Sequence, residues 1–222
     1  MNISNNILKE CLKNVYFING TAYAGKSTMV RMLAEKHKMI HCGENYHDEL
    51  ASKVAVPALQ PNLSYFKTMK SWQEFINRTP DEYEEWINGT SEEASEFEIV
   101  ELLRLSASGK KIIADTNISI ENLHEISDYH RVAIMLSPQS MSVERFFERE
   151  DEEKRFLLRQ IQAAETPEKT MANYQECLAR INSKDYFGKF ENSGFFVLYR
   201  ESSDTDTRNE VFSALEKHFK LI

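Results

Sequence analysis

Cysteine is scarce and scattered in this sequence. Its three cysteines, Cys11, Cys42 and Cys177, form no C-x-x-C pair. An odd, widely spaced set neither staples a secreted scaffold nor matches the usual spacing of zinc ligands. The spacing therefore predicts buried, free thiols in a reducing cytoplasm, and it excludes a disulfide framework.

Long apolar runs and an excess of positive charge are also missing. No run approaches the ~20 apolar residues of a membrane span, and residues 1–6 lack the charged start and apolar stretch of a secretion signal. Lys and Arg number 27 against 35 Asp and Glu, a formal net charge of −8. That balance disfavours nucleic acids and anionic membranes as partners. We expect a cytoplasmic protein with neither partner, and nothing indicates its oligomeric state.

Glycine is sparse as well, yet two of the seven glycines lie in one short motif. Residues 20–28 read GTAYAGKST and match the pattern G-x-x-x-x-G-K-[ST] at every fixed position. The preceding residues 15–19 are mostly apolar or β-branched, and the following residues carry apolar side chains at helical spacing. A strand that leads through such a loop into a helix is typical of a phosphate-binding loop.

The residue types of this loop fit that chemistry. Gly20 and Gly25 allow backbone N–H groups to point inward, and the next helix offers further unpaired N–H groups to an anion. Lys26 is expected to reach the β- and γ-phosphates, and Ser27 to complete an Mg²⁺ shell. The predicted nucleotide-binding residues are Gly20, Tyr23, Ala24, Gly25, Lys26, Ser27 and Thr28.

Five short apolar runs alternate with helical stretches. They span residues 15–19, 39–43, 111–115, 132–137 and 195–200. This alternation predicts one α/β domain, residues 1–222, whose parallel sheet is covered by helices on both faces. Since ligands bind beyond the carboxyl ends of such strands, the residues that follow each run are candidate site residues.

The interval without a predicted strand from residue 44 to 109 is too long for an ordinary connection. We expect a helical insert, residues 44–97, placed over the phosphate site. Capping boxes predict helix starts at Thr79, with Glu82, and at Thr90, with Glu93. The aromatic residues of the insert either form a small core or stack a base. One helix is expected to carry Tyr65, Phe66, Trp72 and Phe75, and another Tyr83 and Trp86.

Two aspartates follow predicted strands. Asp115 ends an apolar run, where a carboxylate commonly orients Mg²⁺-bound water or an attacking hydroxyl beside a phosphate loop. The alternative role is a helix cap, although Thr116, Asn117 and Ser119 follow and can also cap the next helix. Asp48 either accepts a proton from an acceptor hydroxyl or holds a sugar hydroxyl, or it only stabilises a helix N-terminus.

Arginines crowd residues 142–165, a segment that we expect to act as a lid. A planar guanidinium matches the charge of a phosphoryl group in transfer, and a mobile segment would exclude water. Arg149 is the first candidate and Arg145 the second, with Arg155 and Arg159 further along. The alternative is a solvated helix with i,i+4 ion pairs.

The order of these features resembles the P-loop nucleoside monophosphate kinase group, including its shikimate and gluconate kinase relatives and its uncharacterised bacterial members. The likeness covers nearly the whole chain, although only the phosphate loop is a specific motif. It implies a three-layer α/β/α fold with strand order 2-3-1-4-5, an acceptor-binding insert, an arginine-bearing lid, and an adenine against residues 201–205. Tyr23 and Ala24 replace the Gly or Pro common in such loops, and residues 116–118 lack the usual Gly and Pro-Arg. Because of these departures, the resemblance does not identify the phosphate acceptor.

The leading hypothesis is a kinase that uses ATP and Mg²⁺ to phosphorylate a small-molecule or nucleotide acceptor, with Lys26, Asp115, Arg149 and Arg145 as catalytic residues. The alternative is a nucleotide-dependent regulatory or binding ATPase whose insert contacts a macromolecule. The sequence does not separate ATP from GTP.

Overall fold

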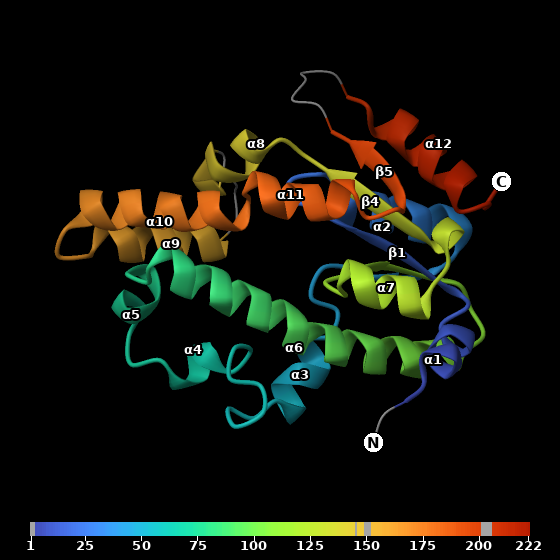
Figure 1. Ribbon diagram of the computed structural model, residues 1–222, viewed down its shortest axis with the longest axis horizontal. Helices are drawn as coiled ribbons and strands as arrows, with labels where there is room; N and C mark the ends of the chain where they lie inside the picture. Colours follow the sequence, from blue (N-terminus) through green and yellow to red (C-terminus); the bar gives the residue numbers. More distant parts are fainter. Residues whose placement is uncertain (1–2, 145, 149–151, 201–205) are drawn as a thin grey trace.

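A five-stranded, all-parallel sheet forms the centre of the structure, a computed structural model that describes residues 3–144, 146–148, 152–200 and 206–222. The strand order is β2-β3-β1-β4-β5 (Figure 1), which confirms the predicted α/β fold and its 2-3-1-4-5 order. Each strand lies within, or within one residue of, a predicted apolar run. The strands are β1 (Val15–Gly20), β2 (Ile40–Cys42), β3 (Ile112–Asp115), β4 (Val132–Leu136) and β5 (Phe196–Tyr199).

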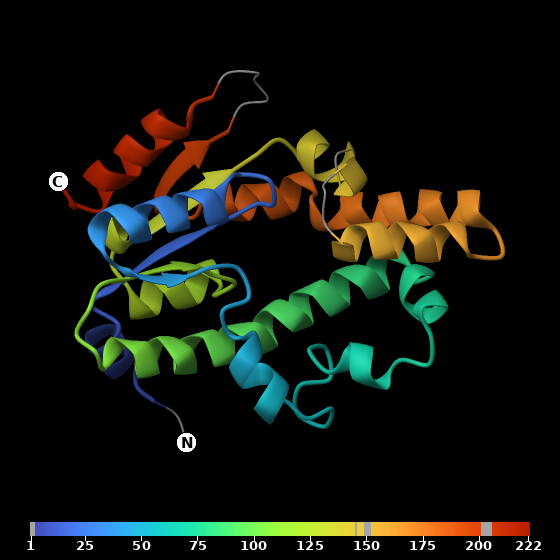
Figure 2. The same ribbon diagram turned by 180° about the vertical axis from the view of Figure 1, so that it is seen from behind.

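Helices cover both faces of this sheet because its strands are apolar on both sides. In β3, Ile112 and Ala114 join one buried cluster and Ile113 joins the other. The first face is covered by α1 (Asn5–Cys11), the carboxyl half of α6 (Pro80–Ser106), α7 (Ile120–Ile126) and α11 (Lys184–Glu191). The second face, turned to the viewer in Figure 2, is covered by α2 (Lys26–His37) and α12 (Arg208–His218).

The segment between β2 and β3 is helical, as the sequence predicts. It contains α3 (Asp48–Val54), α4 (Tyr65–Thr68), α5 (Trp72–Ile76) and the long α6. The predicted capping box at Thr79 is present, with Glu82 as its partner.

Two details of this segment differ from prediction. Thr90 does not begin a helix but lies within α6, where its hydroxyl donates to the Trp86 carbonyl at 2.7 Å. Glu93 instead accepts from the Asn62 and Leu63 amides, which ties the preceding loop to α6. The first aromatic group occupies two short helices, α4 and α5, rather than one.

The insert extends past the carboxyl ends of the strands and packs there against a second helical pair (Figure 1). This pair is α9 (Glu152–Gln162) and α10 (Pro167–Ile181), which follow α8 (Gln139–Glu144) and a 3-10 turn, Phe146–Glu148; a further 3-10 turn, Tyr129–Arg131, precedes β4. Phe75 and Tyr83 of the insert join Tyr174 and Leu178 of α10 in a third buried cluster. Most insert aromatics therefore form a core. None of the described helices combines the length and apolarity of a membrane span.

The cysteine environments predict selective thiol reactivity. Cys42 and Cys177 are buried, but Cys11 is exposed, so the expectation of three buried thiols is wrong for Cys11. Burial raises the pKa of Cys42 to about 12 and that of Cys177 to about 11, which suppresses the reactive thiolate.

Ellman's reagent should titrate one thiol in the native protein and three in guanidinium. Cys11→Ser should abolish the native reaction; fast reaction of a second native thiol would contradict the packing.

Candidate functional site

The loop between β1 and α2 contains three residues with positive φ, and two of them are glycines. Gly20 has φ 130°, Tyr23 φ 65° and Gly25 φ 90°, all in the region that disfavours side chains. A Cβ on Gly20 would lie 1.9 Å from the Met135 carbonyl oxygen. Gly20 thus lets β1 approach the end of β4 closely, and the loop turns directly into α2.

The N-terminus of α2 is open to an anion. Gly25 occupies the cap position and provides no side chain to satisfy the first amides. The Met29 amide donates to the Gly25 carbonyl at 3.2 Å, one helical turn on. The amides of Lys26, Ser27 and Thr28 precede that bond and have no intrahelical acceptor. Phosphate oxygens fit such a cap because they accept from these amides and favour the positive end of the helix dipole.

Lys26, Ser27 and Asp115 meet at this end of the sheet. Ser27 Oγ donates to Asp115 Oδ2 at 2.9 Å, and Lys26 Nζ lies 4.0 Å from Asp115 Oδ1. Lys26 Nζ also donates to the Thr21 carbonyl, so its side chain folds back over the loop. β1 and β3 pair in parallel with Ile18 opposite Asp115, which brings Asp115 to the start of the loop.

Asp115 is buried and accepts a hydrogen bond from Ser27 of the loop rather than capping a helix. Ser119 caps α7 by accepting from the Asn122 amide, so the capping alternative does not apply. Burial raises the pKa of Asp115, while the Lys26 charge and the Ser27 hydroxyl oppose that rise. A hydroxyl, an ammonium and a carboxylate beside an open helix N-terminus suit an Mg²⁺–phosphate group, since Mg²⁺ prefers few carboxylates plus phosphate and water oxygens.

Residues outside the motif fasten the loop. The Ser137 amide donates to Thr21 Oγ1 at 2.8 Å, and Ser137 Oγ donates to the Ala22 carbonyl at 2.5 Å. Arg200, after β5, donates to the Tyr23 carbonyl at 2.7 Å. These residues were not singled out from sequence, although each follows a strand at the edge where parallel sheets bind ligands.

The lid-like segment reaches the loop through α9. Lys154 Nζ lies 5.8 Å from the Tyr23 ring centroid and 5.2 Å from that of Phe146. The preferred arginines, Arg145 and Arg149, lie outside the described residues, as do residues 201–205. The more distal Arg159 belongs to α9, with its guanidinium 5.8 Å from the Phe156 ring centroid.

Asp48 begins α3 and its side chain is 69% exposed, next to the buried His47. No hydrogen bond within the described part of the chain joins it to the phosphate-binding loop. A buried acidic residue that the sequence reasoning missed, Glu98 of α6, bonds to Thr116 and Asn117 directly after Asp115. Its signal was its position between Ala94 and Leu102, four residues from each on the buried stripe.

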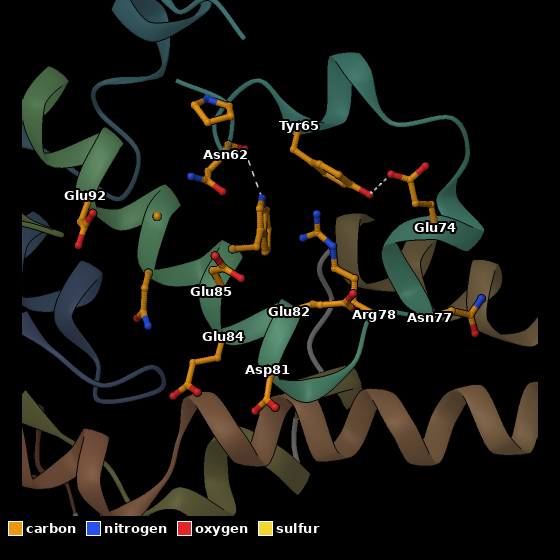
Figure 3. A pocket seen from close by; sticks show the side chains of 14 residues that line it. Asn62, Tyr65, Glu74, Asn77, Arg78, Asp81, Glu82, Glu84, Glu85 and Glu92 are labelled. Atoms are coloured by element: carbon orange, nitrogen blue, oxygen red, sulfur yellow. Dashed lines mark hydrogen bonds between the residues drawn. The ribbon is translucent and has the colours of Figure 1, made fainter. Parts of the chain in front are cut away.

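A cavity of about 1070 Å³ lies on the insert, and the phosphate-binding loop contributes none of its lining residues. In Figure 3 the Arg78 guanidinium lies beside the Tyr65 ring, 3.8 Å from its centroid. Carboxylates dominate the lining: Glu74, Asp81, Glu82, Glu84, Glu85 and Glu92. Among the described residues, no group of three or more His, Cys, Asp or Glu side chains could hold a metal ion. Because its acidic side chains would repel a negatively charged group, this cavity is a poor phosphate site.

Comparisons with protein-family models, with curated proteins and with solved structures found no match for this chain.

Two glycine substitutions separate steric clash from backbone strain. Gly20 and Gly109 both have positive φ, but a Cβ on Gly109 meets nothing within 4 Å. Gly109→Ala should lower the free energy of unfolding by about 1 kcal/mol from strain alone, and Gly20→Ala by at least ~2 kcal/mol more. Urea denaturation measures both. Equal losses would show that the loop does not need its close approach to Met135.

Proposed function

We propose that this protein is an ATP-dependent phosphotransferase that moves the γ-phosphate of ATP·Mg²⁺ to a small acceptor. The observation that carries the proposal is the meeting of Lys26, Ser27 and Asp115 at the uncapped N-terminus of α2. Three kinds of group that phosphoryl transfer requires thus converge on one place: a cation, oxygen ligands for Mg²⁺, and backbone amides.

The chain's own residues divide the work. The amides of residues 23–28 would bind the phosphate chain, and Lys26 would place its charge on the β- and γ-phosphates. Ser27 would exchange its bond to Asp115 for an Mg²⁺ contact, and Asp115 would then hold water of the metal shell. ATP would supply the phosphoryl group, and the bound Mg²⁺ would neutralise part of the negative charge of its phosphates. Catalysis by these residues is positioning and electrostatic stabilisation.

The charge of the insert favours an acceptor without a phosphate group. Residues 44–97 carry eleven acidic and four basic side chains. Two of the basic groups are engaged: Arg78 stacks on Tyr65, and Lys53 pairs with Glu49. A phosphorylated acceptor would meet repulsion there, whereas a neutral or amine-bearing alcohol would not. Asp48, exposed at the start of α3, is the proposed acceptor of the hydroxyl proton.

Replacing Lys26 tests the nucleotide site. Lys26→Ala should lower ATP turnover by at least ~10²-fold, because it removes the charge that meets the phosphates. Lys36→Ala is the matched control, since Lys36 lies on the same helix but pairs with Glu216. Turnover is measured as ADP release, and calorimetry measures affinity for a non-hydrolysable ATP analogue. If Lys26→Ala keeps wild-type turnover, Lys26 has no part in the mechanism.

A panel of acceptors tests the proposed reaction. Nucleosides, nucleotides, sugars, hydroxy acids and amino alcohols are added to the enzyme with ATP and Mg²⁺, and ADP release is measured. An unphosphorylated acceptor should stimulate release at least ~10-fold over water and over its own phosphate ester. ATP hydrolysis that no small acceptor stimulates would favour the regulatory ATPase instead.

A further inference from the structure

Glu98 is a charged residue buried where the fold alone does not require one. It lies within α6 and is 0% exposed. Thr116 Oγ1 donates to Glu98 Oε2 at 2.5 Å, and Asn117 Nδ2 donates to Glu98 Oε1 at 2.8 Å. The Asn117 amide donates to Oε2 at 3.1 Å, and the Tyr46 hydroxyl adds a longer bond at 3.3 Å. The two Asn117 groups can only donate, and the hydroxyls of Thr116 and Tyr46 can donate as well, so the Glu98 oxygens serve as the acceptors of this network.

The partners of Glu98 are the chain neighbours of two proposed site residues. Thr116 and Asn117 directly follow Asp115, the proposed Mg²⁺-side carboxylate. Tyr46 and His47 directly precede Asp48, the proposed proton acceptor. One side chain of α6 therefore bonds to both segments that carry these carboxylates.

His47 completes the link to Asp48. It is 2% exposed, and its Nδ1 lies 3.6 Å from Glu98 Oε1 with no hydrogen-bond partner within the described residues. On the other side of the ring, Nε2 lies 3.5 Å from Asp48 Oδ1. The imidazole thus stands between the buried carboxylate and the exposed one.

Burying the carboxylate of Glu98 without a basic partner is energetically costly. No Lys or Arg is paired with Glu98 among the described residues, and burial raises its pKa although Thr116, Asn117 and His47 oppose the rise. Ala94 and Leu102, one turn away on either side, pack the same stripe without that penalty. The hydrogen bonds of Glu98 offset part of this cost, and they join α6 to two segments that lie far from it in the chain.

We propose that Glu98 is a positioning residue that fixes Asp115 and Asp48 relative to each other. Through it, α6 transmits the placement of the insert to the Mg²⁺ side of the site. The inference rests on the proposed function, because the roles of both aspartates belong to it. Glu98 itself touches neither nucleotide nor acceptor in this scheme.

Glu98→Gln tests the role with little change of shape. The amide keeps the volume of Glu98 but replaces one acceptor by a donor that faces the donors of Thr116 and Asn117. Glu93→Gln is the matched control, because Glu93 lies on the same helix and accepts from Asn62 and Leu63, away from the strand edge. Affinity for a non-hydrolysable ATP analogue is measured by calorimetry in EDTA and again with Mg²⁺. Hydrogen exchange is followed in residues 44–52 and 115–119.

Wild type and Glu93→Gln should gain affinity when Mg²⁺ is added. Glu98→Gln should bind the analogue equally well in EDTA but lose about tenfold of the Mg²⁺-dependent affinity, as happens when an outer-shell partner of a metal site is removed. Exchange should accelerate in both segments of Glu98→Gln together. A merely structural role would leave the gain from Mg²⁺ intact.

Equal Mg²⁺-dependent affinity in Glu98→Gln and wild type would overturn the proposal, as would equal losses in Glu98→Gln and Glu93→Gln. If Glu98→Gln does not fold, Thr116→Val removes the 2.5 Å bond from Thr116 Oγ1 to Glu98. This variant should lose less of the Mg²⁺-dependent affinity than Glu98→Gln, and its exchange should accelerate less. A wild type without affinity for the analogue would refute the proposed function instead. Exchange that rises in only one of the two segments would refute the positioning role whatever the nucleotide does.

Discussion

The parallel pairing of β1 with β3 is the constraint on which the site depends. Its register sets Ile18 beside Asp115, so a buried carboxylate lies where the chain leaves β1 for the loop of residues 20–28. Lys26 and Ser27, in the first turn of α2, then meet that carboxylate. Close approach of Gly20 to β4 and the bonds from Ser137 hold the loop in register with the next strand. The sheet thus positions each charged group before any ligand arrives.

Local patterns were enough to predict the sheet and the loop. The five apolar runs form the five strands because each is bounded by turn or helix signals, and the three central strands are buried on both faces. Lys26, Ser27 and Asp115 were also predictable, since fixed spacing and a strand end determine their place. The strand order itself came from family likeness rather than from the residues. The sequence also argued against a capping role for Asp115, because Ser119 follows it and can cap the next helix; the Ser119–Asn122 bond is that cap.

The errors at Thr90, Glu93 and Glu98 share a physical cause. The Thr90–Glu93 pattern is indistinguishable from a capping box by sequence, but Thr90 bonds back to Trp86 within α6 and Glu93 is taken by a loop thirty residues earlier. Glu98 was missed for the same reason, because its partners at Tyr46 and Thr116 lie far away along the chain. Sequence periodicity reports which side of a helix is buried, but it does not report what that side meets.

Whether the loop at the N-terminus of α2 binds the triphosphate of a nucleotide can be seen in a crystal structure with a non-hydrolysable ATP analogue and Mg²⁺. We expect the β- and γ-phosphates against the amides of residues 23–28, with Lys26 on their oxygens and the metal ion beside Ser27. An analogue bound elsewhere, for example in the acidic cavity of the insert, or a loop left vacant at saturating nucleotide, would contradict it.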